Sequence, residues 1–311
     1  MPRLRTVGLA VLATLALGLA ACGGGDAATT ATTTATAPRP SEAPVRIGTK
    51  DFTEEYILGE LYSQALEAKG FDVELKRNVG SSEIIHQALG NGVLDMYPEY
   101  IGVLLSEVAN VTMRPSSPGA AYGLARQFEE KHGFTLLAQT PFSDANALAV
   151  KPAFAKRTGV NSIDHLRRLS PKPRIGAPKE FKTRFEGLVG LKDVYHIRKP
   201  RYIVLNPDQR YSWLDAGRVD VTLVFTTERQ LSAGRYRVLD DPQRLFGSGH
   251  VAPVISRKAL ETHGPRFRAT VDAVSKKLTT QAMRTMNGAV DIDKRQPGEV
   301  AADFLRAQGL L

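Results

Sequence analysis

Cysteine is almost absent from this chain of 311 residues, in which Cys22 is the only one. A single cysteine excludes an internal disulfide, so the fold has to be stabilised by its hydrophobic core. Long apolar runs are also missing after the first 21 residues, and no later stretch is long enough to cross a membrane as a helix. The composition, with 42% hydrophobic and 23% charged residues, is typical of a globular protein of about two domains.

The sequence motifs of common enzymes are missing too. There is no H-E-x-x-H pair, no G-x-S-x-G elbow, no P-loop and no G-x-G-x-x-G after a strand, and the six histidines are scattered. Asp51, Glu54 and Glu55 lie close together, but acidic residues are favoured in the first turn of any helix. We therefore expect no catalytic residue, no metal and no cofactor, and a binding protein rather than an enzyme.

The net charge is +9, from 41 Lys and Arg residues and 32 Asp and Glu residues. These basic residues are spread along the chain, without the cluster of Lys and Arg between aromatic residues that a nucleic-acid-binding surface requires. We therefore expect a solvated basic surface and no nucleic-acid partner.

The N-terminus has the pattern of an export signal. The basic start MPRLR is followed by the apolar run TVGLAVLATLALGLAA and then by Cys22. The sequence Leu19-Ala20-Ala21-Cys22 resembles a bacterial lipobox, in which the cysteine carries the lipid and becomes the mature N-terminus. We predict a lipoprotein signal peptide over residues 1–21 and lipid attachment at Cys22; the alternative is an ordinary secretory signal with an incidental cysteine.

Residues 22–44 consist mainly of Gly, Ala, Thr and Pro and contain no large apolar residue. Such a stretch cannot bury enough surface to offset the entropy of ordering it, so we predict a disordered tether. The protein is therefore expected outside the cytoplasm, where the lipid anchor attaches it to the outer face of the cytoplasmic membrane.

Two parts of the remaining sequence are similar to each other. Arg-Ile-Gly and a later Lys-acid-Phe occur at residues 46–52 and again at residues 174–181. Residues 89–100 are similar to residues 214–225, with Leu, Gly, Asp and an aromatic residue at matching places. Two similarities in the same order predict two similar lobes; the alternative is that strand–helix–strand units resemble one another in general.

The alternation of buried strands and amphipathic helices predicts an α/β fold, with a mostly parallel sheet and helices on both of its faces in each lobe. Thr53 is expected to cap the first helix. We predict that residues 45–145 and 250–311 form lobe 1 and that residues 146–249 form lobe 2. The chain would then cross twice between the lobes, with a hinge at the crossings and a cleft between the lobes.

Ligands of open α/β sheets bind beyond the carboxyl ends of the strands. Lys50-Asp51 and Tyr100 follow two strands of lobe 1, and Lys179-Glu180 and Phe225 take the matching places in lobe 2. The repeat therefore predicts that both lobes present polar and aromatic side chains to one ligand between them.

The stretches RIGTKDFTEEYILGE and LGNGVLDMYPEYIG resemble the substrate-binding proteins of glycine betaine/carnitine/choline ABC importers, the osmoprotectant-uptake family. The similarity covers about residues 45–256 and is strongest in lobe 1. It implies a type II periplasmic-binding-protein fold, with two α/β lobes that close on a small-molecule ligand. The partners that it implies are the permease and the ATPase of the importer, and we expect a monomer.

In that family an aromatic cage holds a quaternary ammonium, while Lys, Arg and Thr hold a carboxylate. The resemblance places ligand-binding positions at Lys50, Tyr100, Asn146, Arg184, Phe225, Gly249 and His250. Asn146 and Gly249 stand where the family has tyrosines, Phe225 keeps the ring of a third, and the family's threonine becomes Val103. Tyr97 or His250 could substitute for the lost rings, and restoring rings at positions 146 and 249 should raise betaine affinity.

The resemblance implies delivery of a compatible solute of the glycine betaine, choline or carnitine class. Because the cage has lost rings, a ligand without a quaternary ammonium (anionic, hydroxyl-rich or aromatic) is an alternative. An extracytoplasmic enzyme or a surface interaction protein is a further alternative, disfavoured by the missing catalytic residues and by the similarity of the two cleft edges.

Overall fold

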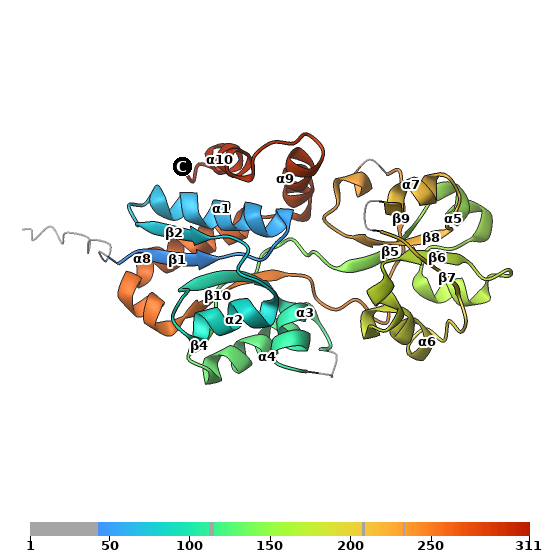
Figure 1. The fold of residues 1–311 in the computed structure, drawn as a ribbon, viewed down its shortest axis with the longest axis horizontal. Coiled ribbons are helices and arrows are strands. Elements are labelled where there is room, and N and C mark those ends of the chain that lie inside the picture. The colour runs from blue at the N-terminus through green and yellow to red at the C-terminus, as the bar shows by residue number, and fades with distance from the viewer. Residues whose placement is uncertain (1–42, 112–114, 207–208, 233) are drawn as a thin grey trace, which may run out of the picture. The chain divides into compact units, whose positions relative to one another are not determined.

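The structure is a computed structural model that describes residues 43–111, 115–206, 209–232 and 234–311 (Figure 1). The predicted signal peptide, Cys22 and nearly all of the tether lie outside the described residues. Among the described helices, none is long and apolar enough to cross a membrane.

The strands form two sheets of five, and the first has the order β2-β1-β3-β10-β4. Its strands are β1 (Val45–Gly48), β2 (Val73–Lys76), β3 (Met96–Tyr100), β4 (Phe134–Leu136) and β10 (Val251–Ser256). β1 pairs in parallel with β2 and β3, whereas β10 pairs antiparallel with β3 and β4.

The second sheet repeats this arrangement in the order β7-β6-β8-β5-β9. Its strands are β5 (Asn146–Val150), β6 (Arg174–Ala177), β7 (Arg201–Val204), β8 (Val221–Phe225) and β9 (Arg237–Val238). β6 pairs in parallel with β7 and β8, and β5 pairs antiparallel with β8 and β9. The chain therefore has the two-lobe α/β fold that its sequence predicts.

Four of the five described strands in each sheet run in the same direction, as predicted, but each sheet is mixed because β10 in the first and β5 in the second run the opposite way. β5 and β10 each enter a sheet directly after the chain has crossed to it, with no helix to carry the chain back to the other edge. Each crossing strand therefore runs opposite to its neighbour, so that Asn146 pairs with Phe225 and Val251 pairs with Tyr100. Parallel neighbours require a crossover connection, and these two connections lack one.

Helices cover both faces of each sheet (Figure 1). One face of the first sheet packs against α1 (Thr53–Glu67), α8 (Arg257–Lys277), α9 (Thr280–Asp291) and α10 (Pro297–Ala307). Its other face packs against α2 (Ser82–Gly90), α3 (Ile101–Val103), α4 (Pro118–Lys131) and the short π-helix Leu104–Val108.

The second sheet has a core on each face as well. One core involves α5 (Pro152–Thr158), α6 (Gly190–Asp193) and the short segments Ile163–Arg168, Lys179–Lys182 and Phe185–Val189. The other involves α7 (Arg210–Asp215) and the turn Arg229–Leu231. Thr53 does not cap α1, contrary to expectation: it begins the helix, and its hydroxyl donates to Asp291 Oδ1 at 2.6 Å.

In both lobes, the Arg of the repeated Arg-Ile-Gly forms hydrogen bonds with the repeated Asp. The backbone N and Nε of Arg46 donate to Asp95 Oδ2, both at 2.9 Å, and Nη2 donates to Asp95 Oδ1 at 2.8 Å. The same three groups of Arg174 donate to Asp220, at 2.8, 3.0 and 2.8 Å. This part of the repeat therefore ties β1 to the start of β3 in lobe 1, and β6 to the start of β8 in lobe 2.

The second part of the repeat is not equivalent in space. Lys50 is buried, with 7% of its surface exposed, whereas 84% of the Lys179 side chain is exposed. The phenylalanines differ in the opposite sense, since Phe52 is 40% exposed and Phe181 is 3% exposed. Lys50 and Lys179 therefore do not form matching walls of one site, contrary to what the repeat predicts.

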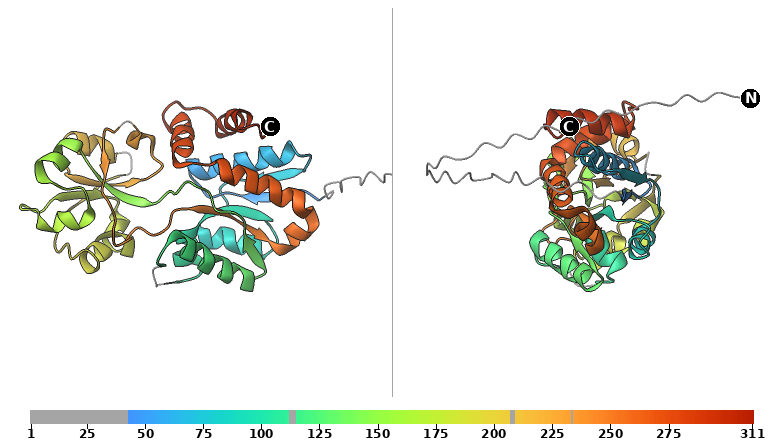
Figure 2. Two further views of the ribbon diagram at one scale, coloured as in Figure 1. Left: turned by 180° about the vertical axis from the view of Figure 1, so that it is seen from behind. Right: turned by 90° about the vertical axis from the view of Figure 1, so that its left-hand side faces the viewer.

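Two connecting segments, residues 137–145 and 239–250, lead from one sheet to the other and are visible in Figure 2 as green and orange traces. They pair with each other where Ser143 faces His250, and the Asp144 N–H donates to the Gly249 carbonyl at 2.9 Å. From α9, Arg284 Nε donates to the Thr226 carbonyl at 2.8 Å. The crossings are therefore joined by backbone hydrogen bonds at the expected hinge.

Candidate functional site

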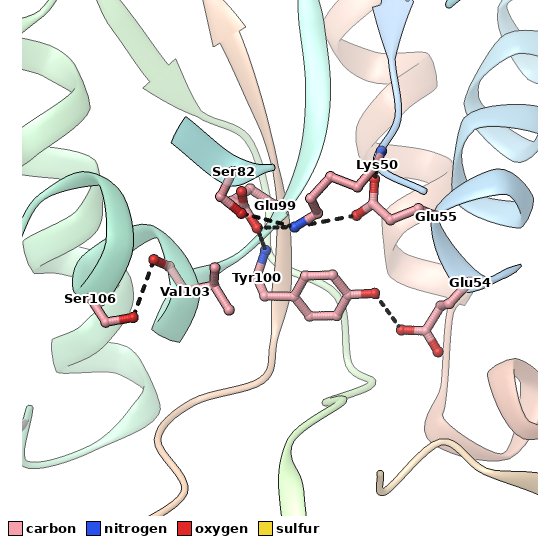
Figure 3. Close-up of polar contacts among 8 residues, drawn as sticks. All are labelled: Lys50, Glu54, Glu55, Ser82, Glu99, Tyr100, Val103 and Ser106. Atoms are coloured by element: carbon pink, nitrogen blue, oxygen red, sulfur yellow. Dashed lines mark hydrogen bonds and ion pairs between the residues drawn. The ribbon is translucent and has the colours of Figure 1, made fainter. Parts of the chain in front are cut away.

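Lys50 and Tyr100 come together at the carboxyl ends of β1 and β3 (Figure 3). The Lys50 ammonium lies 4.7 Å from the centroid of the Tyr100 ring. At the far end of the ring, the Tyr100 hydroxyl donates to Glu54 Oε1 at 2.7 Å. The tyrosine is 5% exposed, so its ring is fixed by groups of its own lobe on two sides.

The ammonium of Lys50 is already paired inside the lobe (Figure 3). It lies 2.5 Å from Glu99 Oε1 and 3.8 Å from Glu55 Oε1, and it donates to Ser82 Oγ at 3.4 Å. Burial lowers the pKa of Lys50, but the negative charges of Glu99 and Glu55 outweigh this and raise the pKa. Lys50 is therefore a charged group held by carboxylates and not a free donor.

Carboxyl groups outnumber ammonium groups in this region. Burial raises the pKa of Glu54, of Asp144 and of Glu55, the last to about 8. Among the described residues, the buried oxygens Thr49 Oγ1, Glu55 Oε1 and Glu99 Oε2 have no hydrogen-bond partner. Lobe 1 therefore has an excess of buried acidic groups near Tyr100, which favours a positive charge over a negative one in their vicinity.

The second lobe contributes Phe225, the last residue of β8, which is 39% exposed. The guanidinium carbon of Arg210 lies 5.1 Å from the centroid of its ring. Arg210 itself is buried, donates to the Leu223 carbonyl at 3.1 Å and forms an ion pair with Glu228. Phe225 is therefore an exposed ring on a rigid support, and not a residue of the core.

Asn146 begins β5 opposite Phe225, and its Nδ2 donates to Glu186 Oε2 at 2.9 Å. Glu186 is half-buried, and this burial raises its pKa. Arg184, two residues earlier, is exposed, and its positive charge lowers the pKa of Glu186 in part, against the larger effect of burial. The pairing of Asn146 with Phe225 and its hydrogen bond to Glu186 thus bring an amide, a ring and a carboxyl group together, and Arg184 lies two residues from Glu186 in the chain.

Glu186 is the residue of this group that sequence reasoning missed. Its signal was weak, because an acidic residue two positions after Arg184 in KEFKTRFEG looks like ordinary surface charge. Only the hydrogen bond to Asn146, which is 40 residues away in sequence, reveals that Glu186 belongs to this edge of the sheet.

Gly249 and His250 lie in the crossing and not on a wall of the site. A Cβ atom at Gly249 would lie 1.9 Å from the Asp144 carbonyl oxygen. The expectation that a tyrosine could be restored at this position is therefore wrong. His250 Nδ1 lies 3.0 Å from the Thr140 carbonyl and 2.9 Å from the Phe142 carbonyl, which fits a proton on Nδ1 and a packing role in the crossing.

Tyr97 cannot replace a lost ring either, because it is 0% exposed within β3. Val103, in the place of the family's threonine, is 36% exposed, and its carbonyl accepts from Ser106 Oγ at 3.4 Å (Figure 3). The described residues contain no group of three or more His, Cys, Asp or Glu that could hold a metal ion.

Residues 43–307 match the model of the family described as the substrate binding domain of ABC-type glycine betaine transport systems. A glycine-betaine-binding protein of Pseudomonas aeruginosa is 31% identical to this chain, covering 86% of it and 88% of the relative. A Helicobacter pylori protein named ergothioneine transport permease/ergothioneine binding protein EgtU is 25% identical over 86% of this chain, and the match spans 48% of that protein.

Among solved structures, one titled glycine betaine/carnitine/choline ABC transporter is similar, with a TM-score of 0.78 and 24% identity. It covers 86% of this chain and 99% of its own. The chain therefore belongs to the family of substrate-binding domains of ABC-type glycine betaine transport systems, and it is a binding protein for a small molecule rather than an enzyme.

Proposed function

We propose that this protein binds a compatible solute with a quaternary ammonium, of the glycine betaine, choline or carnitine class, outside the cytoplasmic membrane. It delivers this solute to an importer permease that the importer's ATPase drives. The observation that carries the proposal is the group at the edge of the second lobe, where Asn146 joins the carboxyl group of Glu186 to the exposed ring of Phe225 and the exposed Arg184 lies two residues from Glu186.

The cationic end of the ligand is assigned to the rings and to Glu186. A trimethylammonium group has no N–H to donate, so it is bound by ring faces, each worth ~2 kcal/mol when desolvated, and by negative charge. Tyr100 and Phe225 end matching strands of the two lobes and supply the rings. Glu186, held by Asn146, supplies a carboxyl group beside the position where the family has a further ring.

The anionic end of the ligand is assigned to Arg184. A carboxylate prefers charge-assisted hydrogen bonds, and a guanidinium offers two parallel donors. Lys50 is the other candidate, but its ammonium lies 2.5 Å from Glu99, so its role is to hold Tyr100 and the surrounding carboxylates in place. Arg184 and Glu186 thus match the two charges of a zwitterion.

The mode of action that we propose is closure of two lobes on the ligand. Residues 45–145 with 250–311 form one lobe and residues 146–249 form the other, and the paired crossings at Asp144 and Gly249 are the hinge. The protein acts as a monomer and is anchored to the outer face of the membrane by a lipid on Cys22. Closure brings Tyr100 and Phe225 to opposite sides of one ligand.

A second candidate ligand is a betaine that also carries a flat ring. The observation that favours it is that Asn146, smaller than the tyrosine that the family has there, pairs with the exposed Phe225. The relative named for ergothioneine supports this class.

Isothermal titration with glycine betaine and with choline tests the assignment of the two ends. Arg184→Met should weaken glycine betaine by about ten-fold or more (~1.4 kcal/mol), because a charged hydrogen bond is lost. Choline lacks the carboxylate, so the same variant should leave its affinity unchanged. Glu186→Gln should weaken both ligands, and Arg198→Met, on a distant loop of the same lobe, should weaken neither.

Two outcomes would contradict the proposal. If Arg184→Met weakens choline as much as glycine betaine, Arg184 does not hold the carboxylate. If the unmodified protein binds ergothioneine but none of glycine betaine, choline and carnitine, its ligand belongs to the class of betaines that carry a ring. A thermal-shift measurement provides an independent check, since a ligand at 100 times its Kd stabilises by ~2.7 kcal/mol.

A further inference from the structure

The positive charge of this protein is concentrated in one lobe. Residues 146–249 contain 20 Lys and Arg residues and 10 Asp and Glu residues. Residues 45–145 and 250–311 together contain 18 and 20, respectively. The second lobe therefore has a net charge of +10, and the rest of the folded chain has a net charge of −2.

Strand register brings much of this charge to a single edge of the second sheet. The parallel strands β6, β7 and β8 begin at this edge, and the antiparallel β5 ends there, because Val150 pairs with both Val221 and Arg237. Apart from Arg174 and Arg235, which pair with Asp220 and Asp215, the basic residues within three positions of these strand ends are Lys151, Lys172, Arg198, Lys199, Arg201, Arg218 and Arg237. We call these seven residues the basic edge. They are spread over the sequence, so the sequence alone shows no cluster of basic residues.

The charges of the basic edge are not neutralised by nearby acids. Asp220 is bound by Arg174, and Asp215 pairs with Arg235 at 3.3 Å, so both of these carboxylates are matched by cations outside the seven. Lys151 donates to the backbone carbonyl of Asp215 at 2.9 Å and keeps its charge. Five of the seven side chains, those of Arg198, Lys199, Arg201, Arg218 and Arg237, belong to exposed residues.

The basic edge also lacks the apolar centre of a protein interface. Among the described residues of the second lobe, the exposed large apolar ones are Phe185, Val204 and Phe225. Val204 and Phe225 end β7 and β8, and Phe185 follows the carboxyl end of β6, so all three lie toward the opposite edge. A specific protein interface has an apolar core with a polar rim, whereas a charged surface without one is attracted by electrostatics alone.

We propose that the basic edge rests on the anionic phospholipid headgroups of the membrane to which the protein is anchored. A lipid surface requires no shape complementarity, and each Lys or Arg close to it contributes up to about a five-fold gain in affinity (~1 kcal/mol). The 22 residues between Cys22 and Val45 have a reach of up to ~70 Å when extended, at ~3.3 Å per residue, so a tether of this length does not hold the folded chain against the lipid in one orientation. The inference uses the proposed function only in placing the chain at a membrane.

This contact would orient the protein. Because the basic edge lies at the start of β6, β7 and β8, lipid contact turns the carboxyl ends of these strands, with Phe225, away from the membrane. The attraction acts over about one Debye length, ~8 Å at physiological salt, and it weakens as salt is added. The second lobe would therefore rest on lipid reversibly, with its ligand-binding edge accessible.

The test uses the full-length exported protein in vesicles of phosphatidylcholine, alone or mixed with phosphatidylglycerol. A dye on Ala216→Cys, at the end of α7 beside Arg218, reports its proximity to acceptor-labelled lipid headgroups by energy transfer. The matched control is a dye on Asn91→Cys, which ends α2 in the corresponding place of the first lobe. Protein without an added cysteine is the labelling blank, and flotation of Cys22→Ala with the vesicles reports the anchor separately.

We expect energy transfer from the Ala216 position to rise with phosphatidylglycerol and to fall with added salt, and transfer from the Asn91 position to change little. Replacing Arg198, Lys199, Arg201 and Arg237 together by Gln should return the signal to that of neutral vesicles. The control variant replaces the same number of exposed lysines elsewhere, Lys131, Lys258, Lys276 and Lys277, and should keep the signal.

A signal that ignores lipid charge would overturn the proposal, as would an equal loss in both four-fold variants, which would show an effect of net charge alone. A rise that requires importer permease in the vesicles would also overturn it and would identify an acidic protein surface as the partner. Ligand titration of the same variants should be unchanged, so a failure here is distinct from a failure of the proposed function.

Discussion

Replacement of Lys50 by Met tests whether this lysine is an internal ion-pair partner or a ligand donor. The structure places its ammonium 2.5 Å from Glu99 Oε1, and the exposed fractions of the two side chains are 9% and 0%. Removal of one partner of a buried pair leaves the other charge unpaired, at a cost of ~3–5 kcal/mol. We expect Lys50→Met to lower the free energy of unfolding by about this amount at neutral pH, measured by urea denaturation.

Two companion variants make this test specific. Lys50→Met combined with Glu99→Gln should recover part of the loss, because no unpaired charge then remains, with a coupling energy of about 1 kcal/mol or more. Lys179→Met, at the matching place of the sequence repeat, should change stability by less than ~0.5 kcal/mol because its side chain is 84% exposed.

A loss of less than ~1 kcal/mol in Lys50→Met, or no recovery of stability on adding Glu99→Gln, would contradict a buried ion pair. A variant that stays stable but loses affinity for glycine betaine would show that Lys50 holds the ligand directly. In that case its ammonium must leave Glu99 when the ligand binds.

Two further predictions concern the crossing and the buried acids. Gly249→Ala should destabilise the protein by ~1–3 kcal/mol through overpacking, because the new Cβ would lie 1.9 Å from the Asp144 carbonyl oxygen. The control is Gly123→Ala in α4, which should not destabilise the protein because no heavy atom lies within 4 Å of the position of its Cβ. Burial raises the pKa of Glu55 from 4.5 to about 8, so between these values the folded state binds more protons than the unfolded state and stability falls as pH rises. Glu55→Gln should remove this loss, on the order of a few kcal/mol between pH 5 and 8, as measured by denaturation at several pH values. The prediction for Glu55 would be contradicted if stability falls equally steeply with pH in Glu55→Gln and in the unmodified protein. The prediction for Gly249 would be contradicted if Gly249→Ala is as stable as the unmodified protein.

The strands and their repetition could be predicted from the sequence because they depend on local patterns. The Arg-Ile-Gly runs and the Asp that follows each helix mark the same three-bond contact in both lobes, between Arg46 and Asp95 and between Arg174 and Asp220. Tyr100 and Phe225 likewise end matching strands, as the alignment of the two halves predicts. Features that repeat along the chain were therefore found without the structure.

The environment of individual side chains could not be predicted in this way. The surroundings of Lys50 depend on Glu99, 49 residues later, and no local pattern distinguishes this buried lysine from the exposed Lys179. The lack of room at Gly249 comes from Asp144, on a segment more than 100 residues earlier in the chain. Glu186 is recognised as a member of the site only through Asn146. Each of these features arises from contacts between distant segments.

The two lobes share a framework but differ at the edges where ligands of such folds bind. In both, an Arg–Asp contact at the start of the sheet fixes the parallel strands, and this contact is nearly identical. At the carboxyl ends, lobe 1 pairs Lys50 with its own carboxylates, whereas lobe 2 leaves Arg184 and Phe225 exposed. An exposed charge is available to a ligand, while a buried and paired one must first be released at a cost. Selectivity between ligands should therefore follow substitutions at Arg184, Glu186 and Phe225 more closely than substitutions at Lys50.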